Sequence, residues 1–162
     1  LSESFLTPAM LPAIIFIIGA LMSFSTGTSW GTFAIVMPIA IPMAVALGAP
    51  LYVTIAAVLS GGLFGDHCSP VSDTTILAAT GSSCGLMEHM WTQLPYAMIC
   101  AGVSIVGFIA AGVTDSVIVT VVCAVLLVIV YNLAGKLKGV SVKNLNIKDI
   151  EKLEAEEASQ SV

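Results

Sequence analysis

The chain has 162 residues, of which 57% are hydrophobic and only 9% are charged. A soluble domain carries about 25% charged residues, so the composition excludes a water-soluble protein and indicates a membrane protein. The net charge is −5, with only five basic residues, so the chain lacks the basic patch that a nucleic-acid-binding protein needs.

The first apolar stretch, residues 10–47, is interrupted by the polar sequence STGTSWG at 25–31. Its arms, 10–24 and 32–47, are shorter than the roughly 20 apolar residues that a full membrane crossing needs. We therefore expect a re-entrant hairpin that enters and leaves the membrane on one side, with its tip at the polar residues. Short apolar segments with such interruptions are typical of a transporter binding site.

A turn at 48–50 leads to a second interrupted segment. Residues 51–64 and 74–80 are predicted to be the halves of one discontinuous helix, broken at 65–73 by the sequence GDHCSPVSD. Irregular backbone at membrane depth is tolerated only where it is buried in protein or lines a wet cavity. An interfacial loop is expected next, at 81–92, where Trp91 suits the headgroup region.

Two full spans are predicted at 94–113 and 117–133, joined by a turn at 114–116. All five lysines follow, beginning with Lys136, which predicts a cytoplasmic tail and a hairpin that opens to the outside. A short soluble helix is expected at 147–158. The four cysteines show no disulfide spacing and are expected to be reduced. The division is a transmembrane part, 1–135, and a charged tail, 136–162.

The broken helix carries the strongest sign of function. Residues 4–135 contain no lysine or arginine and only four acids, of which Asp66 and Asp73 lie in the break. An ionisable residue at membrane depth is costly and marks a functional site by default. Asp66 is predicted near the C-terminal end of a half-helix, where unpaired carbonyls carry partial negative charge and favour a cation such as Na⁺. The same carboxylate can take up a proton; the alternative is a structural, protonated aspartic acid.

The other polar residues of the break leave two interpretations open. Asp73 is predicted to cap the N-terminus of the second half-helix, which is compatible with ion coordination. His67 either relays protons and orients Asp66 or is a packed neutral histidine. Neutral oxygens come from hydroxyl groups, some of which are expected only to satisfy the backbone. These belong to Ser69, Ser72, Thr74 and Thr75.

The hairpin tip offers a second set of hydroxyl groups, those of Thr26, Thr28 and Ser29. Two hydroxyl-rich breaks suggest two walls of one site; the alternative at the tip is a helix kink. The segment 27–31 also fits the Gly-x-Ser-x-Gly pattern, which would make Ser29 the nucleophile of an intramembrane hydrolase. That elbow requires a preceding strand, whereas an apolar helical segment is predicted here.

Three strings now give a resemblance. STGTSWGT at 25–32, SGGLFGDHCSPVSDTT at 60–75 and TQLPYA at 92–97 resemble the NhaC-like sodium/proton antiporter family, over roughly residues 9–113. The resemblance implies the ion-transporter superfamily fold, with re-entrant hairpins and broken helices in two inverted repeats. It also implies ion-site residues at Asp66, Ser69, Asp73, Thr74, Thr26, Thr28 and Ser29.

The expected fold class is therefore an all-α multi-pass membrane protein: a re-entrant hairpin, a discontinuous helix and two full spans, half of an inverted-repeat transporter. The expected function is Na⁺/H⁺ antiport in the inner cell membrane by alternating access, with Asp66 and Asp73 as Na⁺ ligands. No cofactor and no enzymatic reaction are expected. Because relatives in this family exchange Na⁺ against malate or lactate, organic-anion exchange is the alternative.

The expected partners are membrane lipid and an N-terminal repeat of the same transporter, and the resemblance leaves a homodimer open. The chain begins at Leu1 rather than methionine, which suggests that it is part of a longer protein.

Overall fold

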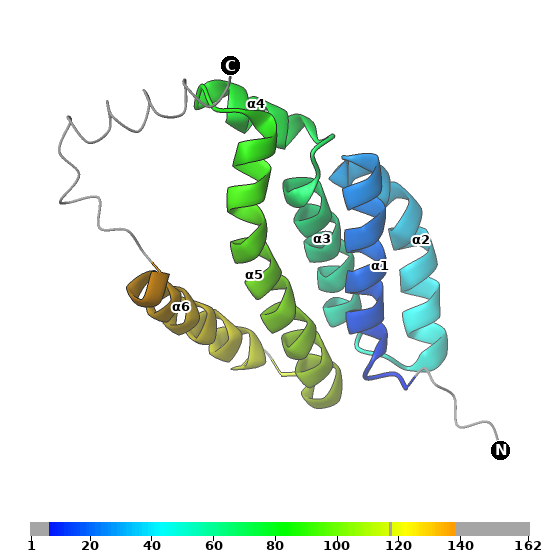
Figure 1. Ribbon diagram of the computed structural model, residues 1–162. Helices are drawn as coiled ribbons and strands as arrows, with labels where there is room; N and C mark the ends of the chain where they lie inside the picture. The colour runs from blue at the N-terminus through cyan, green and yellow to red at the C-terminus, as the bar shows by residue number, and fades with distance from the viewer. Residues whose placement is uncertain (1–6, 117, 139–162) are drawn as a thin grey trace. The chain divides into compact units, whose positions relative to one another are not determined.

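The computed structural model describes residues 7–116 and 118–138, which form helices and no strand (Figure 1). Of these described residues, those up to 127 belong to one compact unit and those from 128 onward to a second one. The all-α fold class is thus confirmed. The helices follow in the order α1 (Leu11–Thr26), α2 (Ser29–Leu47), α3 (Leu51–Cys68), α4 (Asp73–Gly81), α5 (Leu86–Thr114) and α6 (Ile118–Lys138).

Three helices of the described part, α2, α3 and α5, are long and apolar enough to cross a membrane. The helix α1 and the apolar stretch Ile118–Leu133 of α6 are shorter. This corrects the expectation that the second and third apolar segments are too short to cross a membrane alone. Part of the polar residues at each break continue the helices, because their backbone groups still make helical hydrogen bonds, so only residues 27–28 and 69–72 interrupt them.

The hairpin is formed by α1 and α2, which lie side by side (Figure 1). Only Gly27 and Thr28 separate the two helices, so the tip is shorter than predicted. Gly27 ends α1 in the left-handed conformation, with φ 68°, which glycine adopts without steric cost. Thr28 caps α2 by accepting a hydrogen bond from the Gly31 N–H. That both arms open to one membrane face stays a prediction.

The second break is also shorter than predicted, because α3 continues to Cys68 and only residues 69–72 separate it from α4. Pro70 disfavours helical geometry at Ser69, whose backbone is extended, and this ends α3. Asp66 and His67 therefore lie in the last turn of α3 rather than in the break. The N-cap of α4 is Ser72, so the prediction that Asp73 caps this helix is wrong by one residue.

The remaining connections differ from prediction in one place. The turn at 114–116 is confirmed, with Asp115 in the left-handed conformation after α5. The loop predicted at 81–92 is only residues 82–85, because α5 begins at Leu86 and already includes Trp91. The helix predicted at 147–158 and the tail beyond residue 138 lie outside the described residues. The four cysteines are free thiols.

The closest helix packing is between α1 and α3, and glycine makes it possible. A Cβ atom at Gly61 would collide with the carbonyl of Phe16, and one at Gly65 with the carbonyl of Ala20. Small residues let helix backbones approach closely, which is a common basis of association in membranes. Phe16 extends this contact to the aromatic rings of Phe64 and Phe108, at centroid distances of 6.0 and 5.4 Å. The packing fixes α3, and with it Asp66, against the hairpin.

Candidate functional site

The carboxylate of Asp66 lies where both breaks meet. Asp66 is 7% exposed, and each carboxylate oxygen accepts one hydrogen bond from a buried serine. Ser29, the first residue of α2, donates to Oδ2 over 3.0 Å, and Ser72, the N-cap of α4, donates to Oδ1 over 2.6 Å. The tip of the hairpin and the break after α3 therefore form two walls of one site, as the sequence suggested.

Backbone contact holds the two walls together. A Cβ atom at Gly27 would come within 2.8 Å of the carbonyl oxygen of Val71, so no side chain fits between the hairpin tip and the second break. The first residue of α2, Ser29, and the N-cap of α4, Ser72, both donate to Asp66. Both helices therefore point their N-termini, which carry partial positive charge, at the carboxylate. The carboxylate thus has hydroxyl donors and two helix N-termini on the sides that Ser29 and Ser72 occupy.

Ser72 connects the buried carboxylate to a more exposed hydroxyl. Its Oγ accepts a hydrogen bond from the Thr74 N–H over 3.2 Å and lies 2.7 Å from Thr74 Oγ1. A hydroxyl can donate one hydrogen bond and accept two. When Ser72 donates to Asp66, Thr74 Oγ1 must therefore donate to Ser72. The hydroxyl groups of Ser72 and Thr74 and the Asp66 carboxylate form one chain of hydrogen bonds, and Thr74 is exposed.

The carbonyl groups at the end of α3 are less available than the sequence suggested. The Asp66 carbonyl accepts a hydrogen bond from the Ser69 N–H, and the His67 carbonyl accepts from Thr75 Oγ1 and Gln93 Nε2. The oxygens that this structure offers near Asp66 are therefore chiefly those of side chains. Through these hydrogen bonds, Thr75 of α4 and Gln93 of α5 hold the end of α3, and they therefore fix the position of Asp66 along the helix axis relative to α4 and α5.

Several predicted site residues lie apart from the carboxylate. Asp73 is exposed at the start of α4. Ser69 is buried, but its Oγ accepts from the Val71 N–H and shapes the break. Thr26 donates to the Met22 carbonyl and Thr28 caps α2, and both are exposed. The structure therefore brings together Asp66, Ser29 and, through Ser72, Thr74, but not the other candidates.

His67, the candidate proton relay, is exposed, although it follows Asp66 directly. Successive residues of a helix point in directions about 100° apart, so sequence adjacency to Asp66 does not bring the imidazole to the carboxylate. In the described structure, the hydrogen bonds that His67 makes with other elements are accepted by its backbone carbonyl oxygen, in the last turn of α3.

The hydrolase interpretation does not fit the described residues. Ser29 is preceded by the helix α1 and the two-residue tip, whereas a nucleophile elbow needs a strand. Its hydroxyl donates to Asp66 rather than to a histidine. Within the described part of the chain, no three His, Cys, Asp or Glu side chains lie together as a metal centre. One carboxylate surrounded by hydroxyl groups is what this site offers.

Two serines gain importance from the structure. Ser72 was one of several hydroxyl residues in the break, and its preference for N-cap positions is the signal that could have identified it. No sequence signal distinguishes Ser23, because it lies inside an apolar run. Its side chain is completely buried, and its Oγ has no hydrogen-bond partner within the described structure.

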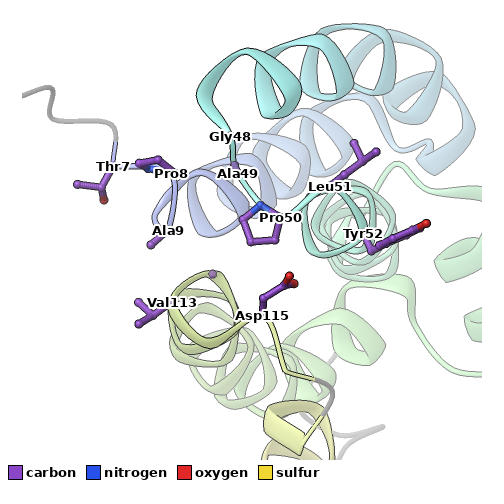
Figure 2. A pocket seen from close by; sticks show the side chains of 11 residues that line it. Thr7, Pro8, Ala9, Gly48, Ala49, Pro50, Leu51, Tyr52, Val113 and Asp115 are labelled. Carbon is purple, nitrogen blue, oxygen red and sulfur yellow. The ribbon is translucent and has the colours of Figure 1, made fainter.

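A cavity of the bundle lies away from this site. A cavity of about 730 Å³ is found where the 48–50 turn and the start of α3 face the end of α5 (Figure 2). Its lining includes Leu51 and Tyr52 at the start of α3, whereas Asp66 is in the last turn. At 1.5 Å per residue, the two ends are about 20 Å apart. This cavity therefore plays no part in the chemistry of Asp66.

Comparison with known proteins decides the family. The model of the Na⁺/H⁺ antiporter family matches residues 1–113, which include the hairpin, both breaks and almost all of α5. This chain belongs to the Na⁺/H⁺ antiporter family. The resemblance seen in the sequence is thus confirmed, and membership agrees with the three apolar helices in identifying a membrane protein. No solved structure matches the chain.

Three relatives illustrate the range of this antiporter family. An uncharacterised protein of Haemophilus influenzae is 55% identical over 108 residues, which are 65% of this chain and 21% of that protein. The malate-2H⁺/Na⁺-lactate antiporter of Bacillus subtilis is 36% identical over 113 residues, 67% of this chain and 24% of the relative. The Na⁺/H⁺ antiporter NhaC of Bacillus subtilis is 35% identical over 100 residues, which are 59% of this chain and 22% of that relative. The matched part of the chain thus spans less than a quarter of each relative.

Proposed function

We propose that the protein to which this chain belongs is a secondary antiporter that exchanges Na⁺ for H⁺ by alternating access, with Asp66 as the residue that binds either ion. The observation that carries the proposal is the buried Asp66 carboxylate, which is held by one serine from each break. A buried acid in a membrane protein marks an ion or proton site by default. Family membership supports antiport, and the NhaC relative supports these two ions.

The hydroxyl chain gives protons a route to the carboxylate. With Asp66 ionised, Thr74 donates to Ser72 and Ser72 donates to Asp66. With Asp66 protonated on Oδ1, the direction of both hydrogen bonds is reversed: Asp66 donates to Ser72 over 2.6 Å, and Ser72 donates to Thr74 over 2.7 Å. Hydroxyl groups can rotate between these arrangements without moving the backbone. The exposed Thr74 is thus the outer end of the proton route, in place of His67.

A Na⁺ ion competes with this proton for the same oxygen atoms. The ion would bind to the ionised carboxylate and to the Ser29 hydroxyl oxygen, because carboxylate and neutral oxygens are the ligands that hard cations prefer. A protonated carboxyl group attracts a cation far less, so the site holds one ion or the other. Alternate binding of Na⁺ and H⁺ at one residue is what exchange requires.

The decisive experiment is Asp66→Asn in the full-length transporter, assayed in inverted membrane vesicles for Na⁺-driven proton movement. Asparagine keeps the shape and offers both a donor and acceptors to Ser29 and Ser72, so the fold should be kept. Only the charge is lost, and exchange should be abolished. The matched control is Asp115→Asn, because Asp115 lies in the turn after α5 with φ 45°, which asparagine also adopts. Normal exchange by the Asp66→Asn protein would refute the assignment.

A second candidate is exchange of an organic anion with coupled Na⁺ and H⁺. It is favoured by the 36% identity to the malate-2H⁺/Na⁺-lactate antiporter. In this case Asp66 would still bind the coupling ions, and the anion would need partners other than lysine or arginine, which residues 4–135 lack. Vesicles loaded with malate distinguish the two functions: stimulation of Na⁺-dependent proton movement by malate supports the second one.

We also propose where the transporter lies and how it is assembled. The transporter would lie in the inner cell membrane with residues 136–162 in the cytoplasm. Its other half would be an N-terminal repeat, whose residues would face the Asp66 site. A homodimer would be the further assembly, and membrane lipid would surround the apolar helices.

A further inference from the structure

The hydroxyl group of Ser23 is buried without a hydrogen-bond partner, which sets it apart from its neighbours on α1. Ser25 and Thr26 donate to the carbonyl groups four residues earlier, those of Leu21 and Met22, at 2.9 Å in both cases. Ser23 makes no such bond, although its side chain is 0% exposed. A buried hydroxyl without a partner destabilises the folded protein, so its presence at a packed helix contact calls for a ligand.

The position of Ser23 points to the Asp66 site. A Cβ atom at Gly65 would lie 2.8 Å from the Ser23 Cβ, so Ser23 packs against the residue that precedes Asp66. One turn further along α1, Gly27 packs against the backbone of Val71 and Ser72, and the Gly27 N–H donates to the Ser23 carbonyl over 2.8 Å. Ser23 thus packs against α3 at the residue next to Asp66, one helical turn from the contact between Gly27 and the break that supplies Ser72.

We propose that the Ser23 hydroxyl is an oxygen ligand of the Na⁺ ion that binds at Asp66, and that it raises the affinity of the site for this ion. The inference rests on the proposed function, because it assumes that Na⁺ binds there. Each carboxylate oxygen of Asp66 already accepts one serine hydroxyl, so a cation needs further oxygens from another side. The Ser23 oxygen has both lone pairs uncommitted, and it comes from α1, which supplies no other group to the site.

The proposal makes opposite predictions for stability without Na⁺ and for the response to Na⁺. Ser23→Ala replaces an unpaired hydroxyl by hydrogen and so removes an unsatisfied polar atom, and the variant should therefore unfold at the same temperature as the wild type or higher in choline chloride. Na⁺ stabilises the state that binds it, by linkage. The Na⁺ concentration that produces a given rise in melting temperature should be about tenfold higher in the Ser23→Ala protein.

The experiment uses the purified full-length transporter in detergent, with NaCl replaced by choline chloride at constant ionic strength. Ser23→Cys is the second variant, because it keeps the shape of the side chain but replaces a hard oxygen by the slightly larger sulfur, a poor Na⁺ ligand. It should show the same weakened Na⁺ response. Ser25→Ala is the matched control, since it also removes one serine hydroxyl from α1 but at an exposed position. Its Na⁺ response should equal that of the wild type.

An unchanged Na⁺ response in the Ser23→Ala and Ser23→Cys proteins would overturn the proposal. Failure of both variants to fold in choline chloride, or a marked loss of stability there, would show that the hydroxyl has a structural partner and would overturn it as well. A wild-type protein that does not respond to Na⁺ would instead refute the proposed function, and this inference with it. The failure of this inference and the failure of the proposed function are distinguishable, because only the failure of the proposed function affects the Na⁺ response of the wild type.

Discussion

Gly65→Ala tests whether the contact between α1 and α3 positions the site. The added Cβ would collide with the Ala20 carbonyl oxygen and lie 2.7 Å from the Phe24 nitrogen and 2.8 Å from the Ser23 Cβ. Ordinary contact begins at 3.4 Å, so the helices must separate by more than half an ångström. Two of the three neighbouring atoms belong to the backbone and cannot rotate away.

The magnitude follows from two opposing effects. Overpacking costs about 1–3 kcal/mol, and the better helix propensity of alanine returns at most about 1 kcal/mol. We therefore expect a net loss of roughly 1–2 kcal/mol in the free energy of unfolding. The matched control is Gly102→Ala in the middle of α5, where no atom lies within 4 Å of the added Cβ. Only the propensity gain applies there, so the control should be as stable as the wild type or more stable.

The assay is thermal unfolding of the full-length transporter in detergent, followed by intrinsic fluorescence, with all three proteins in the same buffer. The melting temperature should fall for Gly65→Ala and should stay constant or rise for Gly102→Ala. If the Gly65→Ala protein were as stable as the Gly102→Ala protein, the close contact of α1 and α3 would be refuted as the element that fixes α3.

Two further predictions concern ion competition and topology. Because Na⁺ and H⁺ compete for the Asp66 carboxylate, the apparent Na⁺ constant of the full transporter should rise with proton concentration, by about tenfold per pH unit where one proton is displaced; a constant that does not change with pH would mean separate sites. If the hairpin is re-entrant, single cysteines placed at Ser4 and Gly48 in a cysteine-free protein should react with an impermeant maleimide from the same membrane face. Reaction from opposite faces would mean that the chain crosses the membrane between them.

The sequence by itself determined the fold class and the importance of Asp66. A nearly uncharged chain with long continuous apolar segments predicts a helical membrane protein, because a helix satisfies the backbone groups of each segment within that segment. It also predicted that two breaks form one site, and the turns at 48–50 and 114–116, where glycine, proline and aspartate have strong local preferences. These properties depend on residue type and local spacing, which are visible without tertiary structure.

Only the tertiary structure decided which hydroxyl groups bind Asp66. The helix boundaries moved by a few residues, because polar side chains at helix ends still allow helical backbone bonds. That shift placed Asp66 in the last turn of α3 and made Ser72 rather than Asp73 the N-cap of α4. Ser23 could not be recognised from its apolar neighbours, since its burial depends on contact with Gly65, 42 residues later in the chain. Contacts between distant segments set the partners of a buried charge, and a linear pattern does not contain them.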